Sequence, residues 1–137
     1  MLHLAAYGFG LDNIEAIDLV SNSPRVRIMD MHHLEFPDNK FDVVISGWVL
    51  PYSREPGLIL AEKMRVLKPG GLFCCGLTRE PPGSDGAKMV HREGAVNYLS
   101  ASQLIADIPT SLERVEFRQE PLNPSRKGAI LLIVRKS

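Results

Sequence analysis

The chain has 137 residues, a length that suits one globular domain with its own core and is too short for two ordinary domains. Lys plus Arg number 16 and so do Asp plus Glu, so no net field attracts nucleic acid or an anionic membrane. No apolar run approaches the roughly 20 residues that cross a bilayer. Composition therefore predicts one soluble domain over residues 1–137, with no nucleic-acid and no membrane partner.

The cysteines and the N-terminus carry no special signature. Cys74 and Cys75 are adjacent in an apolar segment, a spacing that allows no unstrained disulfide between them and matches no metal knuckle. We therefore expect two small buried hydrophobes and no metal site. The first ten residues, MLHLAAYGFG, lack the basic region and the apolar length of a secretory signal, which predicts a cytoplasmic location.

Three segments of the N-terminal half are predicted to be strands. Residues 14–19 are β-branched and flanked by turn-forming residues, residues 26–29 form a second candidate, and residues 41–46 form a nearly continuous apolar run. Such a run suits a strand buried on both faces of a parallel sheet. Apolar residues then recur at helical spacing from 56 to 67, which predicts an amphipathic helix. The sequence Lys68-Pro69-Gly70-Gly71 is expected to stop it and turn the chain.

The C-terminal half is predicted to continue this alternation and to close with a hairpin. Residues 72–77 are expected to form a strand, 78–94 a long mobile connection of the kind that often lies over a site, and 100–108 a helix capped by Ser100 or Ser102. Residues 112–120 and 129–134 predict an antiparallel hairpin. Strands alternating with helices indicate an α/β fold, a doubly wound, mostly parallel sheet with a C-terminal hairpin.

Polar and aromatic residues follow several of the predicted strands. Asp18, Asp30 and the sequence Ser46-Gly47-Trp48 each stand at the carboxyl end of a strand. In doubly wound sheets, ligands bind beyond these ends. We therefore expect the five residues to converge on one crevice.

Four segments together resemble the class I methyltransferases that use S-adenosylmethionine. They read ID at 17–18, DMHHLEFPDN at 30–39, FDVVIS at 41–46 and RVLKPGG at 65–71. Their order and spacing match the family over about residues 12–78. The resemblance implies a Rossmann-like methyltransferase fold and S-adenosylmethionine as the cofactor.

The resemblance also implies roles for two acidic strand ends. Asp18, followed by Leu19, matches the residue that accepts hydrogen bonds from both ribose hydroxyls, a task for a paired acceptor. Asp30 and Met31 match the adenine position, where a carboxylate takes the exocyclic amine and an apolar side chain covers the ring. Read without the resemblance, Asp18 is a turn carboxylate and Asp30 a helix cap.

The resemblance places Ser46, Gly47 and Trp48 at the mouth where the methyl group is transferred. An aromatic face attracts a sulfonium cation, and small residues leave its methyl unobstructed. Family members often have a histidine after this strand, where this chain has Pro51-Tyr52, so the catalytic residues remain unknown. His32 and His33 are either a source of a general base or an exposed pair on a turn.

The front of the family's domain is absent from the sequence. Its central first strand and glycine-rich loop hold the methionine part of the cofactor, yet only 13 residues precede the strand at 14–19. Residues 2–7 are better read as the tail of the following helix, with Gly8 or Gly10 as its cap. A missing central strand leaves unpaired backbone groups. Closing of the neighbouring strands, a strand from another chain, or pairing of two copies would compensate, and the last two favour a homo-oligomer or a partner chain over the exposed edge.

Two functions remain open on these residues. The leading hypothesis is a methyltransferase acting on a small molecule, since methyl transfer depends mainly on alignment and desolvation and needs few acid or base groups. The rival is a non-catalytic methyltransferase-like interaction module or a truncated remnant. Asp18 and Asp30 favour the enzyme, and the missing glycine-rich loop favours the rival.

Overall fold

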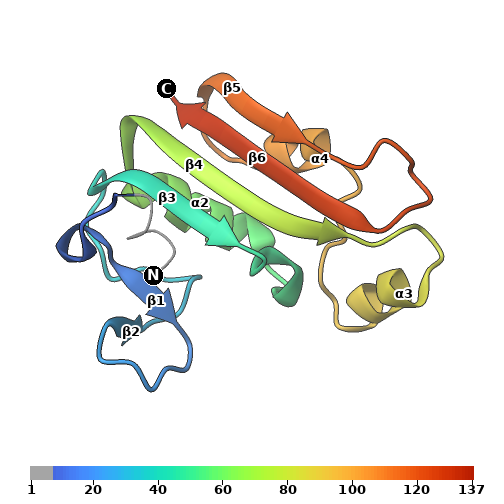
Figure 1. The fold of residues 1–137 in the computed structure, drawn as a ribbon, viewed down its shortest axis with the longest axis horizontal. Helices are drawn as coiled ribbons and strands as arrows, with labels where there is room; N and C mark the ends of the chain where they lie inside the picture. Colours follow the sequence, from blue (N-terminus) through green and yellow to red (C-terminus); the bar gives the residue numbers. More distant parts are fainter. Residues whose placement is uncertain (1–7) are drawn as a thin grey trace. The chain divides into compact units, whose positions relative to one another are not determined.

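The computed structural model describes residues 8–137, which fall into two compact units, one reaching to Glu35 and one spanning Phe36–Ser137 (Figure 1). The single domain expected over residues 1–137 stays a prediction. The expected helix tail at 2–7 lies outside the described residues. Gly8 has a φ of +87°, the left-handed region that a glycine adopts without strain.

The first unit contains a short helical turn, η1 (Leu11–Asn13), and two strands, β1 (Ala16–Asp18) and β2 (Val26–Ile28). The strands are parallel, with Ala16 opposite Val26 and Asp18 opposite Ile28. Just beyond the ladder, the Met29 amide donates to the Asp18 carbonyl at 2.9 Å. The strands predicted at 14–19 and 26–29 are therefore confirmed, somewhat shorter than expected.

The second unit is built on four strands, β3 (Phe41–Gly47), β4 (Leu67–Arg79), β5 (Leu112–Gln119) and β6 (Gly128–Lys136). Their order across the sheet is β3-β4-β6-β5, and Figure 1 shows β3 and β5 at its two edges. The pair β3–β4 is parallel, while β4–β6 and β5–β6 are antiparallel. The predicted C-terminal hairpin is thereby confirmed.

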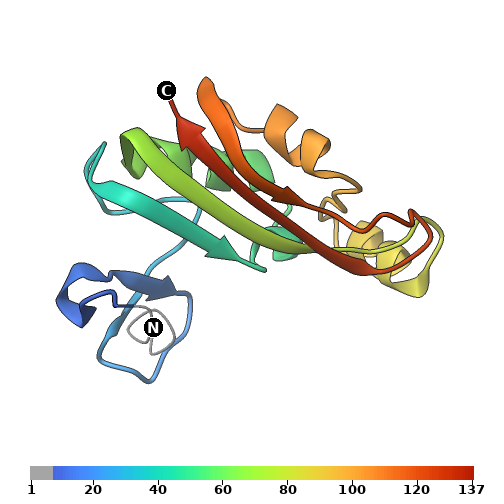
Figure 2. The same cartoon turned by 45° about the horizontal axis from the view of Figure 1, so that its top comes forward.

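Two helices, α2 (Pro56–Val66) and α4 (Ala101–Ala106), cover one face of this sheet. Figures 1 and 2 both show them on the same side of the strands. Ser100 caps α4, its hydroxyl accepting from the Gln103 amide at 3.2 Å, as one of the two predicted caps. The core lies between these helices and the strands, and its fully buried members include Ile59, Leu60, Met64, Phe73, Leu77, Leu104, Ile130 and Leu132.

The stretch Lys68-Pro69-Gly70-Gly71 differs from its prediction as a turn. The helix α2 ends at Val66 and β4 begins at the next residue, so no loop separates the two elements. The stretch forms a wide irregularity in β4, since Phe41 lies opposite Leu67 and Val43 opposite Leu72. A Cβ atom on Gly71 would lie 3.0 Å from the Asp42 carbonyl oxygen, so the backbones approach too closely for a larger residue.

The connection predicted as a loop at 78–94 contains a helix, α3 (Asp85–Arg92). Ser84 caps it by accepting from the Ala87 amide at 3.1 Å. Gly83 and Gly94, with φ of +79° and +75°, bend the chain before and after it. The prediction of an unstructured connection is therefore wrong, although the segment does lie beside a cavity, described below.

Within residues 8–137 no strand precedes β1, and the two sheets share no strand. The same part of the chain contains no helix whose length and apolar character would let it cross a bilayer.

Candidate functional site

The carboxyl ends of β1 and β2 bring two acidic residues close together along the chain's first sheet. The hydrogen bond from the Met29 amide to the Asp18 carbonyl ties the two strand ends together at 2.9 Å, directly before Asp30. The Asp18 side chain accepts from the amide of Leu19 through Oδ1 at 2.7 Å. Both aspartates are exposed. Within the first unit, the structure thus places Asp18 and Asp30 at adjacent strand ends.

Asp30 has a partner that the sequence did not reveal. Its Oδ1 accepts from the His32 amide at 2.9 Å and lies 2.7 Å from His32 Nδ1. The backbone bond from His32 is the larger of these influences, and together they lower the pKa of Asp30 below its ordinary value, so the group is a carboxylate at neutral pH. His32 is therefore half-buried beside Asp30, not a fully exposed turn residue.

These strand ends fit the adenosyl part of the expected cofactor. A carboxylate offers about four acceptor positions on two oxygens, and the Leu19 amide occupies one of those on Asp18. Capacity therefore remains for two ribose hydroxyls. Asp30 keeps acceptor capacity for an amine in the same way, and the half-buried Met31 offers an apolar side chain next to it. The roles of Asp18, Leu19, Asp30 and Met31 nevertheless stay predictions.

The end of β3 presents its three predicted residues in different directions. Ser46 is 2% exposed, on the face that carries the buried Val44, and its hydroxyl has no hydrogen-bond partner within residues 8–137. Gly47 belongs to the opposite face, and a Cβ atom placed on it would meet nothing within 4 Å. Of these two, only Gly47 offers open space, so Ser46 can contribute to a ligand site through its backbone alone.

Trp48 is held in an unusual conformation at the corner after β3. Its φ is +55°, a left-handed value that is rare for a bulky residue and marks positions where the surroundings impose the backbone. Its amide donates to the Gly76 carbonyl at 2.6 Å, and its indole N–H donates to Thr78 Oγ1 at 3.1 Å. A Cβ atom on Gly76 would lie 3.0 Å from the indole ring, so the ring rests on the bare backbone of β4.

A cavity of about 550 Å³ opens beside Trp48 within the second unit. Its wall comes from the ends of β3 and β4, the short helix η2 (Leu50–Tyr52), helix α3 and the residue before β6. We call it the β3–α3 cavity, and its lining includes Trp48, Tyr52, Thr78, Glu80, Met89 and Lys127. Its volume falls in the range of small-molecule sites.

The β3–α3 cavity is lined by charged groups of both signs. Glu80 accepts from Lys127 Nζ at 2.5 Å, and its side chain is only 14% exposed. Arg54 donates through Nε to the Glu93 carbonyl at 2.9 Å. Two acidic and two basic side chains therefore line the cavity, and their formal charges cancel.

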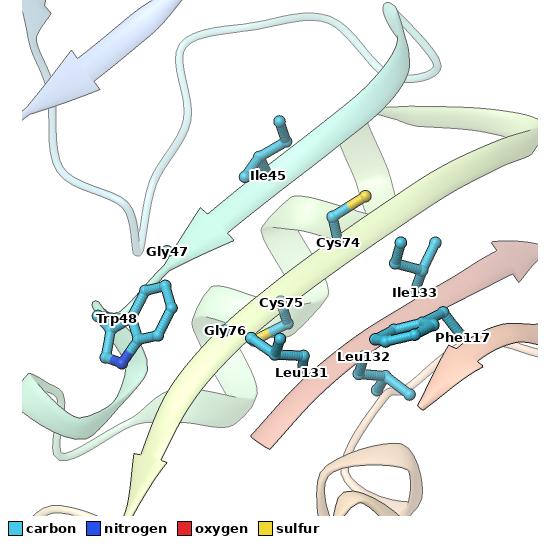
Figure 3. A pocket seen from close by; sticks show the side chains of 10 residues that line it. All are labelled: Ile45, Gly47, Trp48, Cys74, Cys75, Gly76, Phe117, Leu131, Leu132 and Ile133. Carbon is cyan, nitrogen blue, oxygen red and sulfur yellow. The ribbon is translucent and has the colours of Figure 1, made fainter. Parts of the chain in front are cut away.

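A second hollow, of about 250 Å³, lies on the sheet face opposite α2 (Figure 3). Ile45, Cys74, Phe117 and Ile133 of four different strands point to this face, with Trp48 at one end. Such a surface lacks the polar groups that would hold a nucleoside. Cys75 points the other way and is buried, and desolvation raises its thiol pKa to about 12. The prediction of two buried cysteines is therefore confirmed for Cys75 and wrong for the half-buried Cys74.

Sequence reasoning missed most of the β3–α3 cavity. Thr78 and Glu80 sit at the end of β4 and just beyond it, the position where ligands are expected in a wound sheet, so the strand pattern contained that signal. Met89 was hidden because its helix was predicted as a loop. Lys127 joins the cavity only through the pairing of β4 with β6, which brings residues far apart in sequence together.

Sequence comparison links the chain to methyltransferases. A model described as a methyltransferase domain matches residues 8–75. An uncharacterized methyltransferase of Schizosaccharomyces pombe is 43% identical over 54 residues, 39% of this chain and 19% of that protein. A ubiquinone/menaquinone biosynthesis C-methyltransferase of Desulfotalea psychrophila is 39% identical over 59 residues, 43% of this chain and 24% of that protein. The chain thus spans about a fifth to a quarter of the length of these two relatives.

Solved structures share the fold over most of the chain. A protein of Pyrococcus horikoshii OT3 superposes with a TM-score of 0.68 at 17% identity, covering 99% of this chain and 77% of that one. An N-methyltransferase of Bradyrhizobium japonicum WM9, solved with S-adenosyl-L-homocysteine, gives 0.60 at 17% identity, covering 88% and 64%. At this identity the likeness concerns the fold, and it confirms the predicted Rossmann-like α/β class.

Proposed function

The chain belongs, by its sequence match and its fold, to the class I S-adenosylmethionine-dependent methyltransferases, and from this premise we propose that it transfers a methyl group to a small molecule. The observation that carries the proposal is the junction of β1 and β2, where the Met29 amide bonds to the Asp18 carbonyl and two carboxylates follow the paired strands. Family membership alone does not establish activity, because one fold can host many functions.

The first unit would hold the adenosyl part of S-adenosylmethionine. Asp18 would accept the ribose hydroxyls, with its remaining acceptor positions on both oxygens. Asp30, kept ionised by its bonds from His32, would accept the adenine amine, and Met31 would cover the ring. Leu19 contributes the amide that fixes the orientation of the Asp18 carboxylate.

The corner after β3 would supply the surroundings of the reacting methyl group. When bound, the cofactor would supply an electrophilic methyl group on a sulfonium sulfur. Gly47 leaves space next to the strand end, and the half-exposed Trp48 ring offers a face that attracts a cation. Ser46, whose hydroxyl is buried, would take part only through its backbone. No residue is assigned as a base.

A small molecule is the proposed acceptor, held in the β3–α3 cavity. The volume of about 550 Å³ suits such a ligand. The name of the Desulfotalea psychrophila relative, which places that protein in ubiquinone/menaquinone biosynthesis, supports a small acceptor here as well. Alignment of the acceptor in the cavity would supply most of the rate, so sparse acid and base groups are compatible with catalysis.

Calorimetric titration with S-adenosyl-L-homocysteine tests the proposal. We expect micromolar binding, and Asp18→Asn should weaken it about 10- to 100-fold, the value of a lost charge-assisted hydrogen bond. Asp12→Asn is the matched control, because Asp12 lies in η1, outside the predicted contacts, and it should bind like the parent. Absence of heat at millimolar ligand would favour the rival, a non-catalytic methyltransferase-like module.

We also propose that a second copy of the chain, or a partner chain, covers the edge of β3. Among residues 8–137 this strand pairs with β4 alone, and Val43 and Ile45 are 38% and 51% exposed along it. An unpaired edge with apolar side chains favours strand addition. Light scattering that reports a monomer across the accessible concentration range would rule out pairing of copies.

A further inference from the structure

We infer that the β3–α3 cavity selects a flat, uncharged aromatic ring that carries a hydroxyl group. The inference rests on the proposed function only in naming this ligand as the methyl acceptor. The recognition itself follows from the cavity's own residues, and it is tested below without any cofactor. Each part of the ligand description, its flatness, its lack of charge and its hydroxyl, comes from a different feature of the cavity.

Flatness follows from the way Trp48 is fixed. Its backbone is held by the bond to the Gly76 carbonyl at 2.6 Å, and its indole N–H is held by Thr78 at 3.1 Å. One part of the ring rests on Gly76, where even a Cβ atom would be as close as 3.0 Å. The residue is still 50% exposed, so a rigid aromatic surface is presented rather than buried. Such a surface gains most from a ligand that stacks as a plane.

Helix α3 supplies apolar groups to the same cavity. Met89 is 57% exposed although it is apolar, and Val90 follows it in the lining. A thioether contacts aromatic rings favourably and adapts to their shape. The helix is seated closely on the residue after β4, since a Cβ atom on Gly86 would collide with the Glu80 carboxylate. An aromatic plane can therefore be contacted by Trp48 and by Met89 of one compact cavity.

The lack of net charge in the ligand follows from the pairing of the cavity's charges. Glu80 is bound to Lys127, so neither is available as an uncompensated partner for an ammonium or a carboxylate group. Arg54 and Glu93 complete a lining whose charges sum to zero. The lining therefore has no net charge that would repay the hydration lost by a charged ligand, which makes its binding unfavourable.

A hydroxyl group finds both kinds of partner. Lys127 Nζ has three N–H donors, of which one bonds to Glu80, and it is 66% exposed in its side chain. The Thr78 hydroxyl accepts from Trp48 and still has its own O–H to donate. Both residues line the cavity that contains the Trp48 ring, so a hydroxyl on a stacked ring can be satisfied from the wall.

The single tryptophan of the chain makes the inference testable by NMR. With one Trp in the sequence, a ¹⁵N-labelled sample has one indole N–H resonance, which belongs to Trp48. We would titrate the protein, without cofactor, with 2-naphthol at neutral pH, and compare decahydro-2-naphthol, which is saturated, and 2-naphthoate, which is charged. A saturating shift of the indole signal, at least about 5-fold tighter for 2-naphthol than for either comparator, is expected from loss of stacking or desolvation.

Two lysine variants separate the loss of the hydrogen bond to the ligand hydroxyl from a general effect of removing a positive charge. Lys127→Gln should weaken 2-naphthol binding about 3- to 10-fold, the value of one hydrogen bond. Lys88 of α3 is not among the residues that line the cavity; its side chain is 70% exposed and pairs with Asp85, so Lys88→Gln should leave binding unchanged. Equal affinity for the three compounds, no indole shift at millimolar 2-naphthol, or equal loss in the two variants would overturn the inference. Binding of 2-naphthol without binding of S-adenosyl-L-homocysteine would uphold the inference and refute the proposed function.

Discussion

Replacing Gly76 by alanine is expected to displace the Trp48 ring and to destabilise the protein. The added Cβ would lie 3.0 Å from one ring carbon and 3.3 Å from two others. These separations are shorter than the roughly 3.5 to 4.0 Å at which carbon atoms attract each other, so something must move. The ring cannot move freely, because its N–H is bonded to Thr78 and its backbone is held at a φ of +55°.

The magnitude follows from two opposing effects. Overpacking a closely packed position costs about 1 to 3 kcal/mol. Replacing glycine by alanine in an extended strand returns about 0.4 to 1 kcal/mol, because the unfolded chain loses freedom. The free energy of unfolding of Gly76→Ala should therefore fall by about 1 kcal/mol, near the middle of the range of about 0 to 2.6 kcal/mol that the two effects allow.

Gly47→Ala is the matched control, because Gly47 lies directly opposite Gly76 in the β3–β4 ladder. A Cβ atom there meets nothing within 4 Å, so only the gain remains and its unfolding free energy should rise by about 0.4 to 1 kcal/mol. Urea denaturation measures both stabilities, and the indole resonance and fluorescence of Trp48 report the position of the ring. If Gly76→Ala matched the parent in stability and kept the parent's indole resonance, the packing of Trp48 on Gly76 would be refuted.

Three further changes are expected to alter stability. Lys63 is 6% exposed and desolvation lowers its pKa, so the unfolded chain binds the proton more tightly than the folded one. The free energy of unfolding should therefore rise with pH toward 10.5. In urea titrations, Lys63→Met should be about 1 to 3 kcal/mol more stable at neutral pH and should show a flatter rise. Arg79 is 4% exposed and donates to three carbonyls of the β5–β6 connection. Arg79→Met should lower the free energy of unfolding by roughly 3 kcal/mol and should speed amide exchange in that connection. Exchange as slow as in the parent would contradict this. The hydrogen bond from the Ala101 amide, followed by the one from Arg118, lowers the pKa of Glu120. The stability that Glu120 contributes is therefore present above pH 4.5 and lost as the pH falls. In a pH series, the stability of Glu120→Gln should depend less on acid.

The strands were readable from local pattern because their residues are β-branched and lie between turn signals. The parallel pair β1–β2, the strand at 41–47 and the C-terminal hairpin all follow from such signals. Helix α2 was also predicted, but the apolar residues at helical spacing do not all lie on its buried face. Leu58 is 50% exposed while Lys63 is buried, since the sheet that the helix packs on, rather than the periodicity, sets its rotation.

Tertiary pairing explains what the sequence did not reveal. Helix α3 lies among prolines, glycines and charges that indicate a loop, although Ser84 and Asp85 provided the start of a helix. Lys127 meets Glu80 only because β6 returns beside β4. The buried direction of the Ser46 side chain depends on the strand's alternation, which a prediction of strand ends alone does not specify.

Binding of an adenosyl group at the joined ends of β1 and β2 is tested most directly by the two amides that already bond to the candidate carboxylates. The Leu19 amide donates to Asp18 and the His32 amide to Asp30. In a titration of ¹⁵N-labelled protein with S-adenosyl-L-homocysteine, both resonances should shift with one common dissociation constant. A ligand that binds while either amide stays unmoved, or that leaves both unmoved at millimolar concentration, would contradict the assignment of this site.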